Sequence, residues 1–170
     1  MITLINGRGQ LGRRLSQMLK DVTHDEEDVY IYHTWNIDDK SETVQKKEYE
    51  KFLFFIEQHK RAKIIFVSTY SEKENWYNHY KQKSEAYLID KCEKAIVIRL
   101  PTLIGKGTIV KLKNNEISPY GFLELLSLDA AAKSIINKVS YDGIIKNFII
   151  RGETISADSI QQVLSIGEGN

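Results

Sequence analysis

Tyr77 and Lys81 have the residue types and the spacing needed for acid/base chemistry on a carbonyl group. On a helix, side chains four residues apart lie on one face, one turn from each other. A neighbouring ammonium lowers the pKa of a phenol from its ordinary value of about 10, so the tyrosine can donate or accept a proton near neutral pH. A pair of this kind suits hydride transfer to a carbonyl.

Two hydroxyl side chains, Ser68 and Thr69, precede this pair at the end of an apolar segment. A hydroxyl at such a place can hold the oxygen of a substrate. The tyrosine–lysine pair is a weak indication by itself, because both residue types are common on amphipathic helices. It becomes more specific through its position after Ser68 and Thr69 and through the glycine-rich turn of the same chain.

The glycine-rich turn follows the first apolar segment, residues 2–5, and carries the pattern G-x-G-x-x-G at Gly7, Gly9 and Gly12. A strand before it and a helix after it are the context in which this pattern indicates nucleotide binding. Gly9 would let the backbone approach a pyrophosphate, Gly12 would let the helix pack tightly, and the helix N-terminus would offer free N–H groups. An ordinary strand-to-helix turn rich in glycine is the alternative. The candidate residues are Asn6, Gly7, Arg8, Gly9, Gln10, Leu11 and Gly12.

The elements that must position these residues alternate regularly between strand and helix. Hydrophobic patterns predict strands at 2–5, 29–34, 63–69, 95–100 and 147–150, with helices at 13–20, about 43–59, 76–91, 129–139 and from about 156. A loop is expected at 101–107, and a short strand or hairpin at 108–117. This alternation predicts an α/β fold with a doubly wound parallel sheet and helices on both faces.

The composition is that of a soluble globular protein. At 170 residues the chain is long enough for one domain with a hydrophobic core. Its net charge of +1 does not favour binding to nucleic acid or to membranes. The single cysteine, Cys92, allows neither an intrachain disulfide nor a cysteine-based zinc site. The four histidines show no metal-ligand spacing. Without an apolar span or a signal-peptide pattern, the expected location is the cytoplasm.

Four segments together resemble the extended short-chain dehydrogenase/reductases. They are Asn6-Gly7-Arg8-Gly9-Gln10-Leu11-Gly12, Phe66-Val67-Ser68-Thr69, Tyr77 to Lys81 with Glu85, and Arg99-Leu100-Pro101 with Gly105-Lys106-Gly107. The glycine turn and residues 28–42 are similar to the dTDP-4-dehydrorhamnose reductases of the nucleotide-sugar branch, which also contains sugar epimerases. The resemblance covers most of the chain, and the order of the segments is more specific than any one of them.

The resemblance implies a Rossmann-like fold that binds NAD or NADP. By this resemblance, Tyr77 would be the catalytic acid or base, Lys81 would hold the nicotinamide ribose, and Ser68 or Thr69 would orient the substrate oxygen. Thr34 and Pro101 would join residues 6–12 at the cofactor. The implied substrate is a small sugar-like molecule, with nucleotide sugars as a candidate class, and the implied assembly is a homodimer through the helix bearing Tyr77 and Lys81.

The chain also departs from the family pattern. Ile5 and Asn6 stand where the family turn begins with threonine and glycine, although asparagine tolerates a left-handed backbone. His33, Thr34 and Trp35 stand where an acidic residue would hold the adenosine ribose. The segment 29–34 matches the family's fourth strand better than its second, which predicts that the second and third strands, the adenine side of the sheet, are missing. Eight positions separate Thr69 from Tyr77, fewer than usual, and the region after Gly107 is small.

Three functions stay open at this point. The first is an NAD(P)-dependent reductase or epimerase. The second is a degenerate member of the family that kept the fold, lost the cofactor and acts as a binding or assembly partner. The third is a mononucleotide- or phosphate-binding domain that uses only the first strand–helix–strand unit. In each case residues 1–170 are expected to form a single domain, with 108–170 containing a remnant of the substrate region, the last strand and the last helix.

Overall fold

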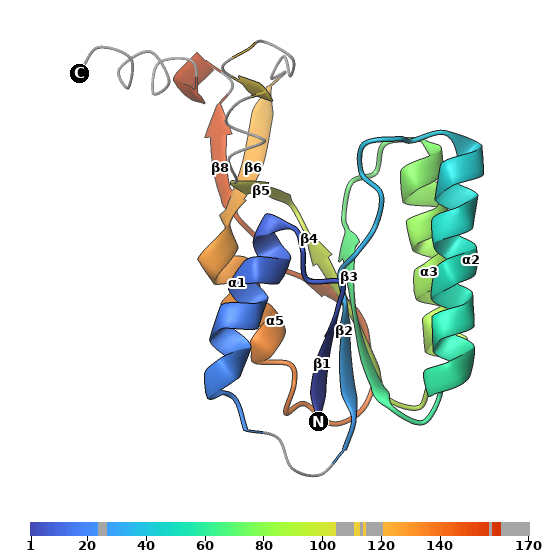
Figure 1. Cartoon of the computed structure of the whole chain (residues 1–170). Coiled ribbons are helices and arrows are strands. Elements are labelled where there is room, and N and C mark those ends of the chain that lie inside the picture. The colour runs from blue at the N-terminus through green and yellow to red at the C-terminus, as the bar shows by residue number, and fades with distance from the viewer. Residues whose placement is uncertain (24–26, 105–110, 113, 115–120, 157, 161–170) are drawn as a thin grey trace.

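The computed structural model of the chain describes residues 1–23, 27–104, 111–112, 114, 121–156 and 158–160 (Figure 1). Its centre is a five-stranded parallel sheet in the order β1-β2-β3-β4-β7. The strands are β1 (Ile2–Ile5), β2 (Val29–Tyr32), β3 (Lys63–Thr69), β4 (Ala95–Leu100) and β7 (Ile145–Ile149). β3 and β4 are nearly continuous runs of buried apolar residues, as is usual for parallel strands covered on both faces. The predicted α/β fold with a parallel sheet is confirmed.

Helices cover both faces of this sheet (Figure 1). α1 (Gln10–Met18), which continues into the short 3₁₀ helix Leu19–Asp21, and α5 (Leu128–Ile136) lie on one face. α2 (Glu42–His59) and α3 (Trp76–Lys91) lie on the other. Alternate residues of β3 point to opposite faces, so Ile65 and Val67 belong to the core under α1 and α5, whereas Ile64 and Phe66 belong to the core under α2 and α3.

β1 is an edge strand, because in the part of the chain that the structure describes it pairs only with β2. The strands follow one another across the sheet in a single direction, as expected if the two strands of the adenine side are missing. Because α1 and α5 lie on one face of the sheet and α2 and α3 on the other, the strand connections through α1 and α5 have the opposite hand to those through α2 and α3. This is unusual, since crossover connections between parallel strands are nearly always right-handed. The glycine-rich turn consequently lies at an open edge of the sheet.

A second sheet, which the sequence did not predict, extends beyond the carboxyl ends of the central strands (Figure 1). It consists of β5 (Thr102–Ile104), β6 (Phe122–Ser127) and β8 (Glu153–Ser156), in the order β5-β6-β8. β5 replaces part of the loop expected at 101–107, whose Gly105, Lys106 and Gly107 lie outside the described residues. In the hairpin expected at 108–117, Lys111 and Leu112 are helical and Asn114 is in a turn, and its other residues lie outside the described ones. Of the last helix, residues 158–160 are described and helical.

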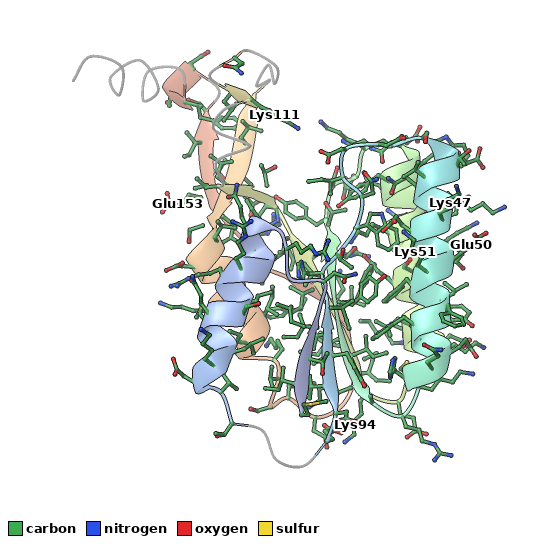
Figure 2. The ribbon with its side chains drawn as sticks, in the orientation of Figure 1. Lys47, Glu50, Lys51, Lys94, Lys111 and Glu153 are labelled. Carbon is green, nitrogen blue, oxygen red and sulfur yellow. The ribbon has the colours of Figure 1, made fainter. Side chains whose placement is uncertain are left out.

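Ion pairs fix the opposite end of the central sheet, where the strands begin. The buried ammonium of Lys63 contacts Glu27 at 3.0 Å and donates a hydrogen bond to the Val139 carbonyl at 2.8 Å. Lys94, which is labelled in Figure 2, joins Glu27 at 2.8 Å and Asp142 at 3.2 Å. Titratable residues also lie at the carboxyl ends of the strands, and there they form the candidate site. No helix among the described residues is long and apolar enough to cross a membrane.

Candidate functional site

The turn between β1 and α1 contains a left-handed residue and a close backbone approach. Asn6 adopts a left-handed conformation with φ of 52°, which confirms that asparagine can start this turn. A Cβ atom added at Gly12 would lie 2.7 Å from the backbone of Gly7 and 2.7 Å from the His33 ring. The close approach expected at Gly12 is thus present, and it joins α1 to the turn and to the residue after β2.

Gly9 has the opposite environment. It is the N-cap of α1, and a Cβ atom added there would meet no atom within 4 Å. Gln10 begins the helix, Leu11 packs against the core under α1, and Arg8 is exposed. Open space in front of Gly9 is what an approaching phosphate group needs at a helix N-terminus.

Tyr77 and Lys81 project from one face of α3, as their spacing predicted. Asn75 caps this helix by accepting a hydrogen bond from the Asn78 backbone N–H at 2.8 Å. The Lys81 ammonium donates to the Val67 carbonyl of β3 at 2.9 Å. Its Nζ lies 5.9 Å from the centre of the Tyr77 ring, and closer to the rings of Trp35 (4.5 Å) and Phe66 (4.6 Å).

The electrostatics of this pair differ from the sequence expectation. Burial lowers the pKa of Lys81 to about 7, although Glu85 and Glu48 act in the opposite direction. Burial also raises the pKa of Tyr77 to about 12, whereas the sequence predicted that the lysine would lower it. The expectation was wrong because burial penalises both charged forms, the phenolate as well as the ammonium. At neutral pH the Tyr77 hydroxyl therefore keeps its proton.

The two candidate hydroxyls have different surroundings. Ser68 is buried and donates to the Glu85 carboxylate at 2.5 Å, and Glu85 also accepts two-pronged hydrogen bonds from Arg99 at 2.5–3.2 Å. Strand alternation places Thr69 on the other face, at the last position of β3. There its Oγ1 accepts from the Ser71 backbone N–H at 3.2 Å, which leaves its own hydrogen available for donation. Ser68 is committed to Glu85, and Thr69 is the better donor toward a ligand.

The short connection between β3 and α3 is held by Asn78, the residue after Tyr77. Its side-chain amide donates to Ser71 Oγ at 3.2 Å and to the Lys73 carbonyl at 2.6 Å, and only 4% of Asn78 is exposed. This anchoring holds the short loop before α3 and thereby positions Tyr77, the second residue of that helix. No pattern in the sequence indicates this role of Asn78.

Thr34 and Asn6 lie together in a cavity of about 320 Å³ beside the glycine-rich turn. Trp35 lines the same cavity and links it to Lys81 through their ring contact. Pro101 is half-buried between β4 and β5. These residues fit the phosphate part of a dinucleotide and its neighbourhood, but no carboxylate directly follows β2 to hold the adenosine ribose. His33 occupies that position, and burial lowers its pKa to about 4.

The sequence alone assigned no role to two buried residues of this region, of which Glu85 was named only as part of the family resemblance. Glu85 lies four residues after Lys81, so the spacing 77–81–85 already placed all three on one helical face. Gln45 of α2 is fully buried and accepts from the Trp35 indole N–H at 2.7 Å. Burial of an isolated glutamine has no signature in one sequence. Among the described residues, no group of histidine, cysteine, aspartate or glutamate side chains is placed to hold a metal ion.

No family model matches this chain, and no curated protein sequence matches it. Solved structures are similar to it in fold. UDP-N-acetylglucosamine 4-epimerase from Bacillus cereus has a TM-score of 0.76 and 14% identity, with 99% of this chain and 84% of that chain covered. The Bordetella bronchiseptica enzyme WbmG in complex with NAD has a TM-score of 0.75 and 12% identity, with 99% and 78% covered.

A third similar structure is the dTDP-4-dehydrorhamnose reductase of Bacillus anthracis in complex with NADP. Its TM-score is 0.72 at 13% identity, with 98% of this chain and 80% of that chain covered. The similarity extends over almost the whole chain. The chain therefore has the fold of the nucleotide-sugar epimerases and reductases of the extended short-chain dehydrogenase/reductase family.

Proposed function

We propose that this chain binds a nicotinamide dinucleotide and acts as a short-chain-type oxidoreductase or epimerase on the carbonyl or alcohol group of a sugar-like substrate. The observation that supports the proposal is that two features lie at the same edge of the central sheet, where its parallel strands end. One is the open turn at Gly9, and the other is the Tyr77–Lys81 face of α3. Nucleotide sugars are the first substrates to test, because the similar structures include nucleotide-sugar epimerases and reductases.

In this proposal each residue has a separate task. A bound nicotinamide would supply or accept the hydride. The Tyr77 hydroxyl keeps its proton at neutral pH because its pKa is about 12, so it acts as the proton donor to the carbonyl oxygen. Thr69 donates a hydrogen bond to the same oxygen, and Lys81 fixes the end of β3 through the Val67 carbonyl.

The first experiment is a titration of the purified chain with NADH and NADPH, following nicotinamide fluorescence and thermal stability together. A ligand that binds only the folded state raises the apparent stability once its concentration exceeds its Kd. Saturable stabilisation by either dinucleotide supports the proposal. Its absence at millimolar concentration contradicts it.

Gly9→Asp is the matched control for this titration. The new side chain has open space around it and suits an N-cap, so the fold should be unchanged or slightly more stable. Its negative charge should repel a phosphate at the same helix end, so the stabilisation by dinucleotide should disappear.

Once a substrate is found, Tyr77→Phe should abolish turnover with cofactor binding retained, and full activity of that variant would contradict the role of Tyr77.

A specific observation favours a second function, that of a binding partner without catalysis. The Ser68 hydroxyl, on the same side of the sheet as Tyr77, is bound to Glu85, and no carboxylate directly follows β2 to hold the adenosine ribose. A chain that had lost its cofactor would show both features. The same titration separates the two functions, because such a partner would not respond to either dinucleotide.

A further inference from the structure

The edge of the central sheet that β1 forms offers backbone groups to a further strand. The Val29 N–H donates to the Met1 carbonyl at 2.9 Å, and Ile2 lies opposite Val29 in the parallel pairing of β1 with β2. Successive residues of a strand direct their N–H and C=O groups to opposite sides, so those of Thr3 point to β2 and those of Ile2 and Leu4 point outward. Among the described residues β1 pairs only with β2. The outward groups of Ile2 and Leu4 are therefore available for pairing.

The other edge of the sheet, β7, is protected against such pairing, whereas β1 is not. β7 carries the exposed Lys146, and its pairing with β4 shifts register between Ile96 and Ile98. Charged side chains and bulges are the features by which proteins keep edge strands from pairing with other chains. β1 has the sequence Ile-Thr-Leu-Ile, without charge or proline, and its register with β2 is continuous.

The side chains of β1 leave this edge open in the folded chain. Ile2 and Leu4 pack against the core under α1 and α5, so they do not cover their own backbone groups. Thr3 points to the opposite face, on which α2 lies, and it is partly exposed. Figure 1 shows β1 between α1 and α2, which flank the edge from the two faces of the sheet.

The two ends of this edge carry opposite charges that are not neutralised within the described chain. At the carboxyl end, Asp38 lines the cavity that also contains Asn6. At the amino end, Arg61 lines a second cavity, of about 460 Å³, between β2 and the end of α2. Both side chains are exposed, and neither has an ion-pair partner among the described residues. Lys60, beside Arg61, is already paired with Glu57 at 2.5 Å.

An antiparallel second copy fits both the backbone and the charges. We propose that β1 pairs with β1 of a second copy of this chain about a two-fold axis at Thr3, which joins the two central sheets into one. Ile2 then forms a hydrogen-bonded pair with Leu4 of the second copy, Leu4 pairs with its Ile2, and the two Thr3 residues face each other. Only this antiparallel register uses the outward groups of Ile2 and Leu4 in both copies.

The same two-fold axis places the carboxyl end of each edge beside the amino end of the other. Asp38 of each copy therefore faces Arg61 of the other, so unlike charges meet at both ends of the contact. Because β1 has only four residues, we expect a monomer–dimer equilibrium and not an obligate dimer. The contact does not involve α3 and does not depend on cofactor binding.

Thr3→Cys tests the register directly. Residues that face each other in a non-hydrogen-bonded antiparallel pair have Cα atoms about 4.5 Å apart, which is within the range of a disulfide. Mild oxidation should convert Thr3→Cys into a covalent dimer on a non-reducing gel, whereas the chain's own Cys92 is only 3% exposed and should not react. Asn147→Cys is the matched control, because Asn147 is exposed on the other edge strand beside the retained Lys146.

Sedimentation velocity measures the association without a cross-link. The parent chain should pass from monomer to dimer as its concentration rises. Thr3→Lys places two ammonium groups at the axis and should weaken the association at least about tenfold. Thr3→Val keeps the size and branching of the side chain and should associate like the parent. Thermal melts should show that both variants remain folded, because Thr3 is partly exposed in the single chain.

A charge exchange tests the antiparallel arrangement. Asp38→Arg alone and Arg61→Asp alone should each weaken the association about tenfold, because like charges then meet at both ends of the contact. The double variant should recover the affinity of the parent, since the unlike pairs are restored with their signs exchanged. Failure of the double variant to recover would overturn the antiparallel arrangement.

Three further results would overturn the proposal. The first is a parent chain that stays monomeric at every concentration. The second is a dimer that Thr3→Lys leaves intact, which would place the association elsewhere, for example on α3. The third is equal cross-linking of Thr3→Cys and Asn147→Cys. A covalent dimer of Thr3→Cys alone, together with a monomeric Thr3→Lys, would establish pairing through β1.

Discussion

At the scale of single residues, the two neighbouring hydroxyls of β3 have separable roles. Ser68→Ala should lower the free energy of unfolding by about 1–2 kcal/mol, because a buried hydrogen bond to a carboxylate is lost. Thr69→Val should change stability little and lower kcat about 100-fold, the usual loss when one donor to a reacting oxygen is removed. Urea unfolding and steady-state kinetics on the two variants measure both effects. If Ser68→Ala lost activity with its stability intact, the roles would be reversed.

Lys81 makes the stability depend on pH. Its pKa is about 7 in the folded chain and 10.5 in its ordinary state, so between these values the unfolded chain binds more protons. The free energy of unfolding should therefore rise from about pH 7 to about pH 10, by at most about 1.4 kcal/mol per pH unit. Tyr77, with its pKa raised to about 12, reverses this trend only above about pH 10.

Lys81→Met tests this dependence, since an apolar side chain of similar length removes the titrating group. Urea unfolding at pH 7, 8 and 9 should show a rising stability in the parent chain and a much flatter profile in Lys81→Met. Lys83→Met is the control, because Lys83 is exposed on the same helix and should leave the rise unchanged. Parallel profiles for all three proteins would contradict the assignment to Lys81.

At the scale of elements, the sequence predicted those whose pattern is complete within the element itself. β3, α3 and β4 were predicted at their observed bounds, because long buried strands are continuous apolar runs and α3 is a long helix between them. β5 and β8 were missed because strands of three or four residues are too short to show a period. β6 was missed because it pairs with β5 and β8, which lie far from it in the chain.

The candidate site, too, could be predicted from the sequence only where its features depend on neighbouring residues in the chain. The spacing of Tyr77 and Lys81 and the glycine pattern were local, and the structure has both in the expected elements. The commitment of Ser68 to Glu85 and the burial that raises the Tyr77 pKa depend on how α3 packs on β3 and β4. Tertiary contacts of this kind leave no pattern in a single sequence, so the direction of the Tyr77 pKa shift could not be predicted.

At the scale of the whole molecule, the dimer implied by the family resemblance remains a prediction. It would form through α3, which packs beside α2 on one side of the sheet (Figure 1). The outer faces of these helices carry many charged residues, including Lys47 and Glu50, which Figure 2 shows on the outer side of α2. Phe54 and Trp76 are the large apolar side chains exposed there. Such a surface favours a salt-sensitive association over an obligate one.

One carboxylate links the second sheet to the end of β3 by hydrogen bonds. Glu124 of β6 accepts hydrogen bonds from the Tyr70 hydroxyl, from Arg151 Nη1 at 3.0 Å and from the Gly152 backbone N–H at 2.7 Å. Tyr70 follows β3 directly after Thr69, whereas Arg151 and Gly152 precede β8. The position of the second sheet is thus coupled to the strand end that carries the candidate site.

Glu124→Gln should loosen this coupling, because it removes the charge that strengthens all three hydrogen bonds. Amide hydrogen exchange in β6 and β8 should become about tenfold faster, with β3 and β4 unchanged, since local opening does not require the core to unfold. Glu153→Gln is the control: Glu153 is exposed on β8 and forms no ion pair among the described residues (Figure 2). Equal exchange in both variants would mean that the two sheets are held by the chain connections and apolar contacts alone. Faster exchange only in Glu124→Gln would make Glu124 the residue through which the second sheet fixes Tyr70 beside the candidate site.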